Sequence, residues 1–442
     1  MNIDIKKKRL IVLCILVVGA GGLLISRLIN IQIVYGCKYG TIALNQSTGR
    51  TEIPAERGAI YDRTGRQLAI NVIKNSLFAD PADETEIRKI YTYLDRLYKQ
   101  ARGTARGNYP LIPDKFKWID RNLPDELATQ VMKDSIPGLY INKNLNREYP
   151  FGEVGQRLLG STNIDGQGIS GLEYSYDSIL AGKAGLTDFL RDGQRTTYQL
   201  REIPIVASIP GHSIILTIDW YFQEIVEEEL KAAVEKYKAL EGSAIFIDCH
   251  TGEILAAADY VADGRNDPIK LRAISNVFEP GSVFKVFTAA AILDGNLARP
   301  EELINCENGA WRCGPRILHD DHRHGNLTFR EVIEVSSNIG TAKMAIRLGG
   351  KKLGEIDRRF GFGQRYFIGL PGEAAGSISN PGKWSAYNTA VLAIGQAVSV
   401  TALQLAAGVS AIANGGKLYR PKVIRGLLDS NGKPIKRFEP DL

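Results

Sequence analysis

A long apolar run opens the chain. Residues 10–25 contain no charged side chain, and the apolar character resumes over residues 28–34 after Arg27. A bilayer core of about 30 Å requires ~20 apolar residues in a helix, and the stem of Arg27 can reach toward the interface. The pattern therefore predicts a single membrane-spanning helix over residues 10–34. The alternative is a cleaved signal peptide, which has a shorter apolar segment and a small-residue cleavage site; no convincing site follows Gly36.

The rest of the chain divides into two regions that differ in the length and period of their apolar patterns. Residues 36–205 contain short apolar alternations and one charged helical stretch over residues 84–100, which predicts an extended α+β domain. Residues 206–442 carry longer periodic segments, with sheet patterns first and helices after them, which again indicates an α+β fold. The predicted elements there are a strand over 213–218, a helix with an apolar stripe through Phe222, Val226, Leu230, Val234 and Tyr237, a hairpin turning at 250–252, and helices beginning at Ser282, Leu327 and Thr401.

The charge distribution orients the chain across a membrane. Residues 1–9 hold four cations and one carboxylate, so they contribute +3 (4 − 1) to a formal net charge of +6. Because Lys and Arg favour the cytoplasmic flank of a spanning helix, we expect residues 1–9 to be a cytoplasmic tail. The bulk of the chain then lies on the outer, extracytoplasmic side of the membrane. The remaining charge is small and mixed in sign, which excludes the concentrated basic face of a nucleic-acid-binding protein.

A serine and a lysine at helical spacing are the best candidates for chemistry. Pro280 and Gly281 break the chain just before a helical run, so Ser282 falls in its first turn, where free N–H groups favour a developing negative charge. Lys285 lies on the same face and can take the serine proton if burial keeps it neutral. The spacing alone is a weak signal, because Ser430 and Lys433 repeat it in a polar turn and a capped helix with a solvated lysine fits it too.

A second segment strengthens that hypothesis. Ser336, Ser337 and Asn338 follow Ser282 by 54 residues (336 − 282) and precede another helical run. A second hydroxyl and an amide can pass a proton and hold a peptide carbonyl. The simpler reading of Ser336 is a helix cap. The two segments in this order favour a serine acyl-transfer site.

Two other groups of reactive residues are ambiguous. Residues 319–324 combine three histidines with two carboxylates, but close spacing on one loop disfavours a tetrahedral site, so we predict a solvated loop and no metal. Cys306 and Cys313 can either form a disulfide in an oxidising compartment or remain free thiols, and the sequence leaves both open.

Several motifs follow one another along the chain. The first part of the soluble chain holds residues 57–69, 147–150 and 168–173, and the second part holds residues 251–256, 279–285, 336–338, 370–373 and 413–416, with Gly395, Gln396, Thr401 and Gln404. Together these motifs resemble the class B penicillin-binding proteins, the monofunctional peptidoglycan D,D-transpeptidases of the bacterial cell wall. The resemblance implies a transmembrane helix, a pedestal of the dimerisation type, and a serine transpeptidase domain of helices around an antiparallel sheet. It also implies an enzyme without a cofactor.

The resemblance also implies a role for each candidate residue. Ser282 would attack the penultimate D-alanine carbonyl of a stem peptide, and Lys285 would be its general base. Ser336 would relay the proton to the leaving amine, and Asn338 would orient Lys285 and the donor peptide. β-Lactams would trap Ser282. The implied partners are peptidoglycan stem peptides, a polytopic glycosyltransferase, and other membrane proteins of cell division or elongation.

One family motif is missing from these residues. No Lys-Thr or Lys-Ser dipeptide occurs, so the Lys-Thr-Gly strand that supplies an oxyanion donor in the family is absent. We therefore expect a transpeptidase domain that is incomplete at its C-terminus, with little or no activity. A non-catalytic, membrane-anchored scaffold of the wall-synthesis complex is the alternative. A β-lactamase or antibiotic sensor would share the serine and lysine but not the pedestal.

Overall fold

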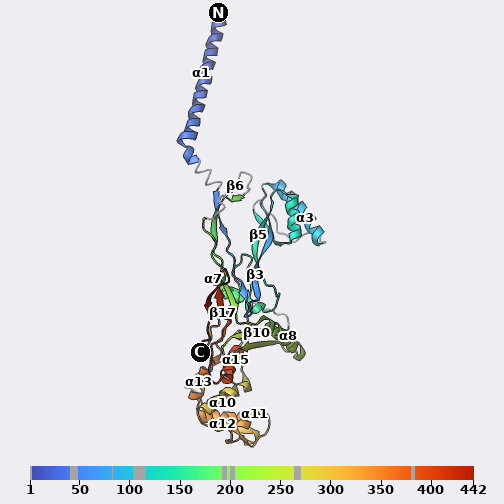
Figure 1. Cartoon of the computed structure of the whole chain (residues 1–442), viewed down its shortest axis with the longest axis vertical. Helices are drawn as coiled ribbons and strands as arrows, with labels where there is room; N and C mark the ends of the chain where they lie inside the picture. The colour runs from blue at the N-terminus through green and yellow to red at the C-terminus, as the bar shows by residue number, and fades with distance from the viewer. Residues whose placement is uncertain are drawn as a thin grey trace. The chain divides into compact units, whose positions relative to one another are not determined.

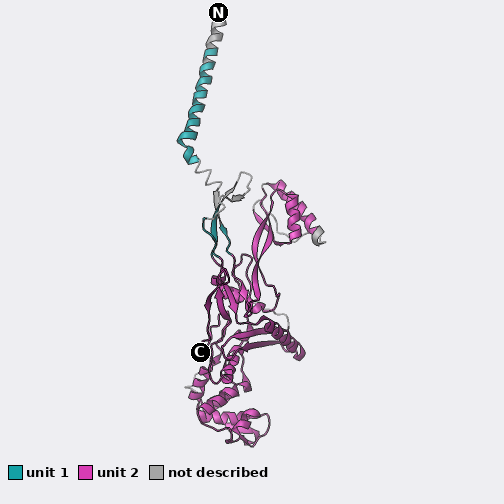
Figure 2. Ribbon diagram, viewed as in Figure 1, with its two compact units in different colours: residues 1–55, 183–209 teal, residues 56–182, 210–442 magenta. Residues whose placement is uncertain are grey.

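The structure, a computed structural model, describes residues 2–39, 48–81, 83–102, 116–191, 197–199, 205–262, 270–379 and 384–442. The chain divides into two compact units (Figure 2). The first comprises Met1–Ala55 and Lys183–Ile209, and the second Glu56–Gly182 and Pro210–Leu442.

The first unit begins with the predicted apolar helix. α1 (Asn2–Ile29) continues into a π-helical turn, η1 (Asn30–Val34). The segment Leu13–Val34 has a mean hydropathy of 2.0 and is not buried, so it is long and apolar enough to cross a membrane. It is a candidate anchor near the predicted position. The same unit holds an antiparallel sheet in which β6 (Gly185–Arg191) lies between β1 (Thr48–Ile53) and β7 (Thr197–Gln199).

The second unit contains a lobe built on one long strand. The elements of this lobe are β3 (Gln67–Ala79), β4 (Lys117–Leu123), β5 (Leu139–Glu148), α3 (Glu84–Arg102) and α4 (Asp125–Asp134), with both outer strands antiparallel to β3 (Figure 1). Strand alternation places Leu77, Ile119 and Leu139 on one face of the sheet, where they pack with Ile90 and Leu94 of α3. The charged helix predicted over residues 84–100 is α3.

A larger sheet connects distant parts of the same unit. Among the described residues its order is β18-β17-β8-β2-β3-β4, with β5 also paired to β3. The new strands are β2 (Ile60–Tyr61), β8 (Ser213–Leu216), β17 (Ile424–Leu428) and β18 (Pro434–Arg437). β8 lies parallel to β2 and antiparallel to β17, so the last hairpin of the chain extends a sheet that begins near residue 60.

The predicted hairpin forms a separate two-stranded sheet. β9 (Glu241–Ile247) pairs antiparallel with β10 (Ile254–Val261). α8 (Trp220–Tyr237) packs across it through Val226, which contacts the cluster around Ala256 and Ala258. Most of the predicted stripe is therefore the buried face of α8. Its last residue, Tyr237, is the exception and is 74% exposed.

A helical layer completes the second unit around a core that includes Phe284, Phe287 and Phe362, each fully buried. Its helices are α9 (Arg272–Ser275), η2 (Gly281–Phe284), α10 (Lys285–Asp294), α11 (Phe329–Glu334), α12 (Asn338–Leu348), α13 (Gly350–Arg359), α14 (Ala386–Ala393) and α15 (Ala402–Ala413). The short pieces are α5 (Gln156–Leu159), α6 (Gly171–Ser175), α7 (Asp177–Leu180), η3 (Glu307–Gly309), and the pairs β11 (Leu303–Asn305) with β14 (Asn326–Thr328), β12 (Ala310–Cys313) with β13 (Arg316–His319), and β15 (Ser377–Ile378) with β16 (Val398–Ser399). The predicted α+β class is confirmed.

Candidate active site

The turn before Ser282 is held by a second loop. Gly281 has φ +59°, a left-handed conformation that suits glycine. Its N–H donates to the carbonyl of Gly395 at 2.9 Å. A Cβ at Gly395 would meet the carbonyl oxygen of Gly281, so this close backbone approach requires glycine there. The contact fixes where η2 begins and places Ser282 on its exposed side.

Lys285 is the first residue of α10 and is 2% exposed. Its Nζ donates to the carbonyl oxygen of Ser336 at 2.5 Å and to Ser336 Oγ at 2.9 Å. Burial lowers the pKa of Lys285 from 10.5 to about 8, and the carboxylates of Asp320 and Asp321 partly oppose this shift. A substantial neutral fraction near pH 8 makes the amine a competent base.

Ser336 lies in a tight turn between two helices. α11 ends at Glu334, α12 begins at Asn338, and Ser336 adopts φ +57° between them. The helix cap is its neighbour Ser337, whose Oγ accepts from the N–H of Gly340 at 3.0 Å. The simpler reading of Ser336 as a helix cap is therefore wrong. The left-handed backbone instead accompanies the contact between Ser336 and Lys285 Nζ.

The structure brings Lys285 and Ser336 into direct contact but arranges the other two candidates differently. Among the described residues, Ser282 Oγ has no hydrogen-bond partner, as is common for a nucleophile before substrate binds. Asn338 Nδ2 donates to the carbonyl oxygen of His319 at 2.8 Å, and no hydrogen bond in the described part of the chain joins it to Lys285. The four assigned roles stay predictions.

Sequence reasoning missed Asp320. Its carboxylate accepts from Ser337 Oγ at 2.7 Å and from the N–H of Ile339 at 2.9 Å. The residue stood out only as part of the histidine-rich loop, and no periodic signal connects it with a helix that begins 18 residues later (338 − 320). In that loop, His319, Asp321 and His322 are exposed. No group of three or more potential metal ligands gathers within the described ranges.

The two cysteines whose pairing was open are both free thiols. Cys306 belongs to the core that holds Phe284, whereas Cys313 belongs to a different apolar cluster with Leu318 and Ile339. Burial raises the pKa of both thiols, which keeps them protonated. The disulfide alternative is not realised in this structure.

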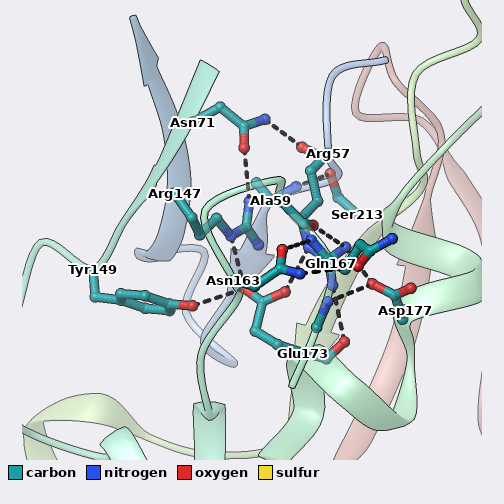
Figure 3. Close-up of polar contacts among 12 residues, drawn as sticks. Arg57, Ala59, Asn71, Arg147, Tyr149, Asn163, Gln167, Glu173, Asp177 and Ser213 are labelled. Carbon is teal, nitrogen blue, oxygen red and sulfur yellow. Dashed lines mark hydrogen bonds and ion pairs between the residues drawn. The ribbon is translucent and has the colours of Figure 1, made fainter. Parts of the chain in front are cut away.

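The pedestal motifs meet in a buried ionic network (Figure 3). Glu173 is fully buried and accepts from Arg57 Nε at 2.6 Å through Oε2 and from Arg147 Nε at 2.7 Å through Oε1. Arg57 also reaches Asp177 Oδ1 at 2.6 Å, and Asn71 Nδ2 donates to the Arg57 carbonyl at 2.5 Å. Three segments far apart in sequence are thus tied together by charge-assisted bonds.

Three further motif residues, Glu373, Thr401 and Gln404, bind loop backbone or cap a helix. Glu373 accepts from the backbone N–H groups of Tyr366 and Ile368. Gln404 forms a capping box with Thr401 at the start of α15, and its Nε2 donates to the carbonyls of Gln364 and Ala375, both at 2.8 Å. These side chains hold the backbone of the loops that they contact.

Comparison with known proteins agrees with this arrangement. Residues 52–216 match the penicillin-binding protein dimerisation domain, and residues 242–440 match the penicillin-binding protein transpeptidase domain. A probable peptidoglycan D,D-transpeptidase of Neisseria gonorrhoeae, PenA, is 33% identical over 394 residues, which cover 87% of this chain and 67% of the relative. The chain belongs to the class B penicillin-binding proteins. The fold and family expected from the motifs are thereby confirmed.

Other relatives of this penicillin-binding protein give the same answer. The peptidoglycan D,D-transpeptidase FtsI of Escherichia coli strain K12 is 31% identical over 390 residues, covering 84% of this chain and 64% of the relative. The crystal structure of penicillin-binding protein 3 from Mycobacterium tuberculosis complexed with aztreonam is 27% identical, with a TM-score of 0.65, and covers 88% of this chain and 71% of that one. The chain therefore spans about two thirds of the length of the PenA and FtsI sequences that it matches.

Two features of the catalytic half bear on activity. The 442 residues contain no Lys-Thr-Gly or Lys-Ser-Gly sequence. Within the described residues, β9 pairs only with β10, so its other edge has no strand partner, and Phe246 on β9 is 43% exposed. An unpaired edge carries free N–H and C=O groups. Ser282, Lys285 and Ser336, the candidate nucleophile, base and second serine, are thus present in these residues without the family's third motif.

Proposed function

We propose that this penicillin-binding protein acts on peptidoglycan by serine acyl transfer, as a D,D-transpeptidase. The contact between Lys285 Nζ and Ser336 Oγ carries the proposal, because it joins a buried amine of lowered pKa to a hydroxyl, one helical turn from Ser282. The names of the relatives PenA and FtsI support the same reaction. No cofactor is required.

The proposed mechanism uses four side chains, three of which transfer protons or form bonds. Ser282 Oγ attacks the penultimate D-alanine carbonyl while Lys285 Nζ takes its proton. The C–N bond to the terminal D-alanine then breaks, and Ser336 Oγ, 2.9 Å from Lys285 Nζ, gives its proton to the departing amine and takes the proton that Lys285 accepted. An amine from a second stem peptide then attacks the ester and loses a proton to Lys285. The ester bond to Ser282 breaks, the cross-link forms, and that proton restores the Ser282 hydroxyl. Asn338 would hold the donor peptide through its amide.

The membrane setting is part of the proposal. With α1 as an anchor, residues 1–9 are cytoplasmic by the positive-inside rule and the catalytic part lies outside the inner membrane. The candidate site then lies on the same side of the membrane as the cell wall. The protein partners proposed from the family resemblance are a polytopic glycosyltransferase and other membrane proteins of division or elongation.

We expect the 442-residue polypeptide to react slowly. Loss of one oxyanion donor costs about 10²- to 10³-fold in rate. The test is acylation by a fluorescent penicillin, followed over hours by intact-protein mass spectrometry, with Ser282→Ala as the control. Slow labelling that disappears in the control supports the proposal. Fast stoichiometric labelling overturns the expected slowness, and labelling that persists in Ser282→Ala removes Ser282 from its role.

The alternative function, a non-catalytic scaffold, is supported by a difference between the pedestal and the transpeptidase part. The ionic network around Glu173 is fully formed, whereas the third catalytic motif is absent from these residues. A scaffold would bind its membrane partners through the pedestal and need no reactive serine. Complementation of a strain depleted of its own class B enzyme separates the two, because only the scaffold hypothesis predicts that Ser282→Ala complements as well as the unmodified chain.

A further inference from the structure

Asp320 accepts hydrogen bonds from the residues immediately before and after Asn338, which are Ser337 and Ile339. It follows β13 and faces the first turn of α12, where its two carboxylate oxygens accept from Ser337 Oγ and from the N–H of Ile339. The adjacent carbonyl of His319 accepts from the side chain of Asn338. A carboxylate here also interacts favourably with the positive end of the helix.

The opposite side of this turn faces the general base. Ser336 comes directly before Ser337, and it presents both its carbonyl and its hydroxyl to Lys285 Nζ. A left-handed conformation costs a residue other than glycine about 1 kcal/mol or more, so neighbouring contacts must maintain it. The Asp320 carboxylate supplies such contacts, because it is hydrogen-bonded to Ser337, the residue after Ser336, and to Ile339.

We propose that Asp320 is the positioning residue of this site, because its carboxylate holds the turn formed by residues 336–338 so that Ser336 faces Lys285 Nζ. The role is indirect, since Asp320 itself contacts neither Ser282 nor Lys285 by a hydrogen bond in the described structure. The inference rests on the proposed acyl-transfer function.

A purely structural reading is that Asp320 only stabilises the start of α12. The neighbouring Asp321 allows the two to be separated. Both carboxylates raise the pKa of Lys285 against the effect of burial, and they are the charged groups that act on it. Asp321, however, is exposed and makes no hydrogen bond within the described residues. Asp321→Asn therefore removes a comparable charge without touching the turn.

The first experiment needs no enzyme activity. Hydrogen exchange of the full chain in detergent, read by mass spectrometry over residues 335–341, is compared for the unmodified protein, Asp320→Ala, Asp320→Asn and Asp321→Asn. We expect exchange at the start of α12 to accelerate about tenfold in Asp320→Ala, less in Asp320→Asn, which keeps one acceptor, and not at all in Asp321→Asn. Equal exchange in all four proteins overturns the inference. Thermal unfolding confirms that each variant is folded.

The second experiment measures the pH dependence of slow Ser282 acylation by the fluorescent penicillin. Removing either carboxylate lowers the pKa of Lys285 further, so the acidic limb of the profile moves to lower pH in both Asp320→Ala and Asp321→Asn. The plateau rate should fall about tenfold or more only in Asp320→Ala, because only that change releases Ser336. If Asp320 only stabilised the start of α12, the limb would still move, but the plateau rate of Asp320→Ala would equal that of Asp321→Asn.

The two experiments also separate this inference from the proposed function. A plateau in Asp320→Ala equal to that of the unmodified chain overturns the positioning role. If the unmodified chain is never acylated, the proposed function fails, while the exchange experiment still decides whether Asp320 holds the turn.

Discussion

Two buried cationic sites show how the same fold uses charge in opposite ways. In the pedestal, Arg57 and Arg147 are almost fully buried and share the carboxylate of Glu173, with Asp177 as a further partner. In the catalytic half, Lys285 is equally buried but donates only to the neutral carbonyl and hydroxyl of one serine.

The two sites differ in the cation, a guanidinium or an amine, and in its partner. A buried guanidinium with a carboxylate in direct contact ties segments together. A buried amine with neutral acceptors keeps the desolvation cost of its charge, which lowers its pKa to about 8. A buried cation in contact with a carboxylate therefore stabilises the fold, whereas a buried amine without such a contact has a lowered pKa and can act as a base. Four changes test this contrast.

The largest effect is expected at the base itself. Lys285→Met should slow Ser282 acylation by about 10²- to 10⁴-fold, because a general base contributes that much to proton transfer. The free energy of unfolding should stay equal or rise, since the change removes an amine that is buried without a counter-ion. Penicillin labelling and denaturant unfolding measure the two quantities. Severe destabilisation together with retained labelling would contradict the contrast.

The opposite outcome is expected in the pedestal. Glu173→Gln should lower the free energy of unfolding by about 3–5 kcal/mol, because it leaves a buried guanidinium without its charged partner. Urea unfolding followed by circular dichroism measures the loss. A change below about 1 kcal/mol would mean that the network is no stronger than a surface pair.

The pH dependence of stability gives a third test. Lys285 has a folded pKa of about 8 against 10.5 as its ordinary value, so between these values the unfolded chain binds more protons than the folded one. The free energy of unfolding, relative to Lys285→Met, should therefore rise with pH by up to about 3 kcal/mol across that window. Below pH 8 the difference should be constant. A difference that falls between pH 8 and 10 would show that Lys285 is not buried as an amine.

The smallest effect is expected for a pair at the surface. Arg121 and Asp165 are 2.8 Å apart, but the Asp165 side chain is 65% exposed. Asp165→Asn should change the free energy of unfolding by less than about 1 kcal/mol. It serves as the control for Glu173→Gln in the same denaturation series, and a loss as large as that of Glu173→Gln would show that contact, not burial, sets the energy.

Local patterns predicted most of the regular elements. The stripe of apolar residues became α8, and the turn over residues 250–252 joins β9 to β10. The break at Pro280 and Gly281 placed Ser282 in the first helical turn, although that turn is a short 3-10 segment before α10. These predictions succeed because each depends on residues within a few positions of one another.

Contacts between distant residues were beyond such reasoning. Nothing in the periodicity shows that β17 pairs with β8, since about 200 residues separate the two strands and hairpin and helix patterns carry no record of partners so far apart. The contacts of Asp320 with Ser337 and Ile339 were missed for the same reason. In the sequence, Asp320 is flanked by histidines, a pattern that is typical of a metal site and gives no indication of a contact with α12.

The sequence by itself determined the apolar N-terminal helix, the α+β class, the family and the identity of the candidate nucleophile and base, because hydrophobic period, capping residues and ordered motifs are local properties. Only the tertiary structure decided that Ser336 faces Lys285, that Asp320 holds the turn beside them, and that Glu173 gathers two arginines. Burial and the choice of partner set the charge state of each group, and both arise only when distant segments pack together.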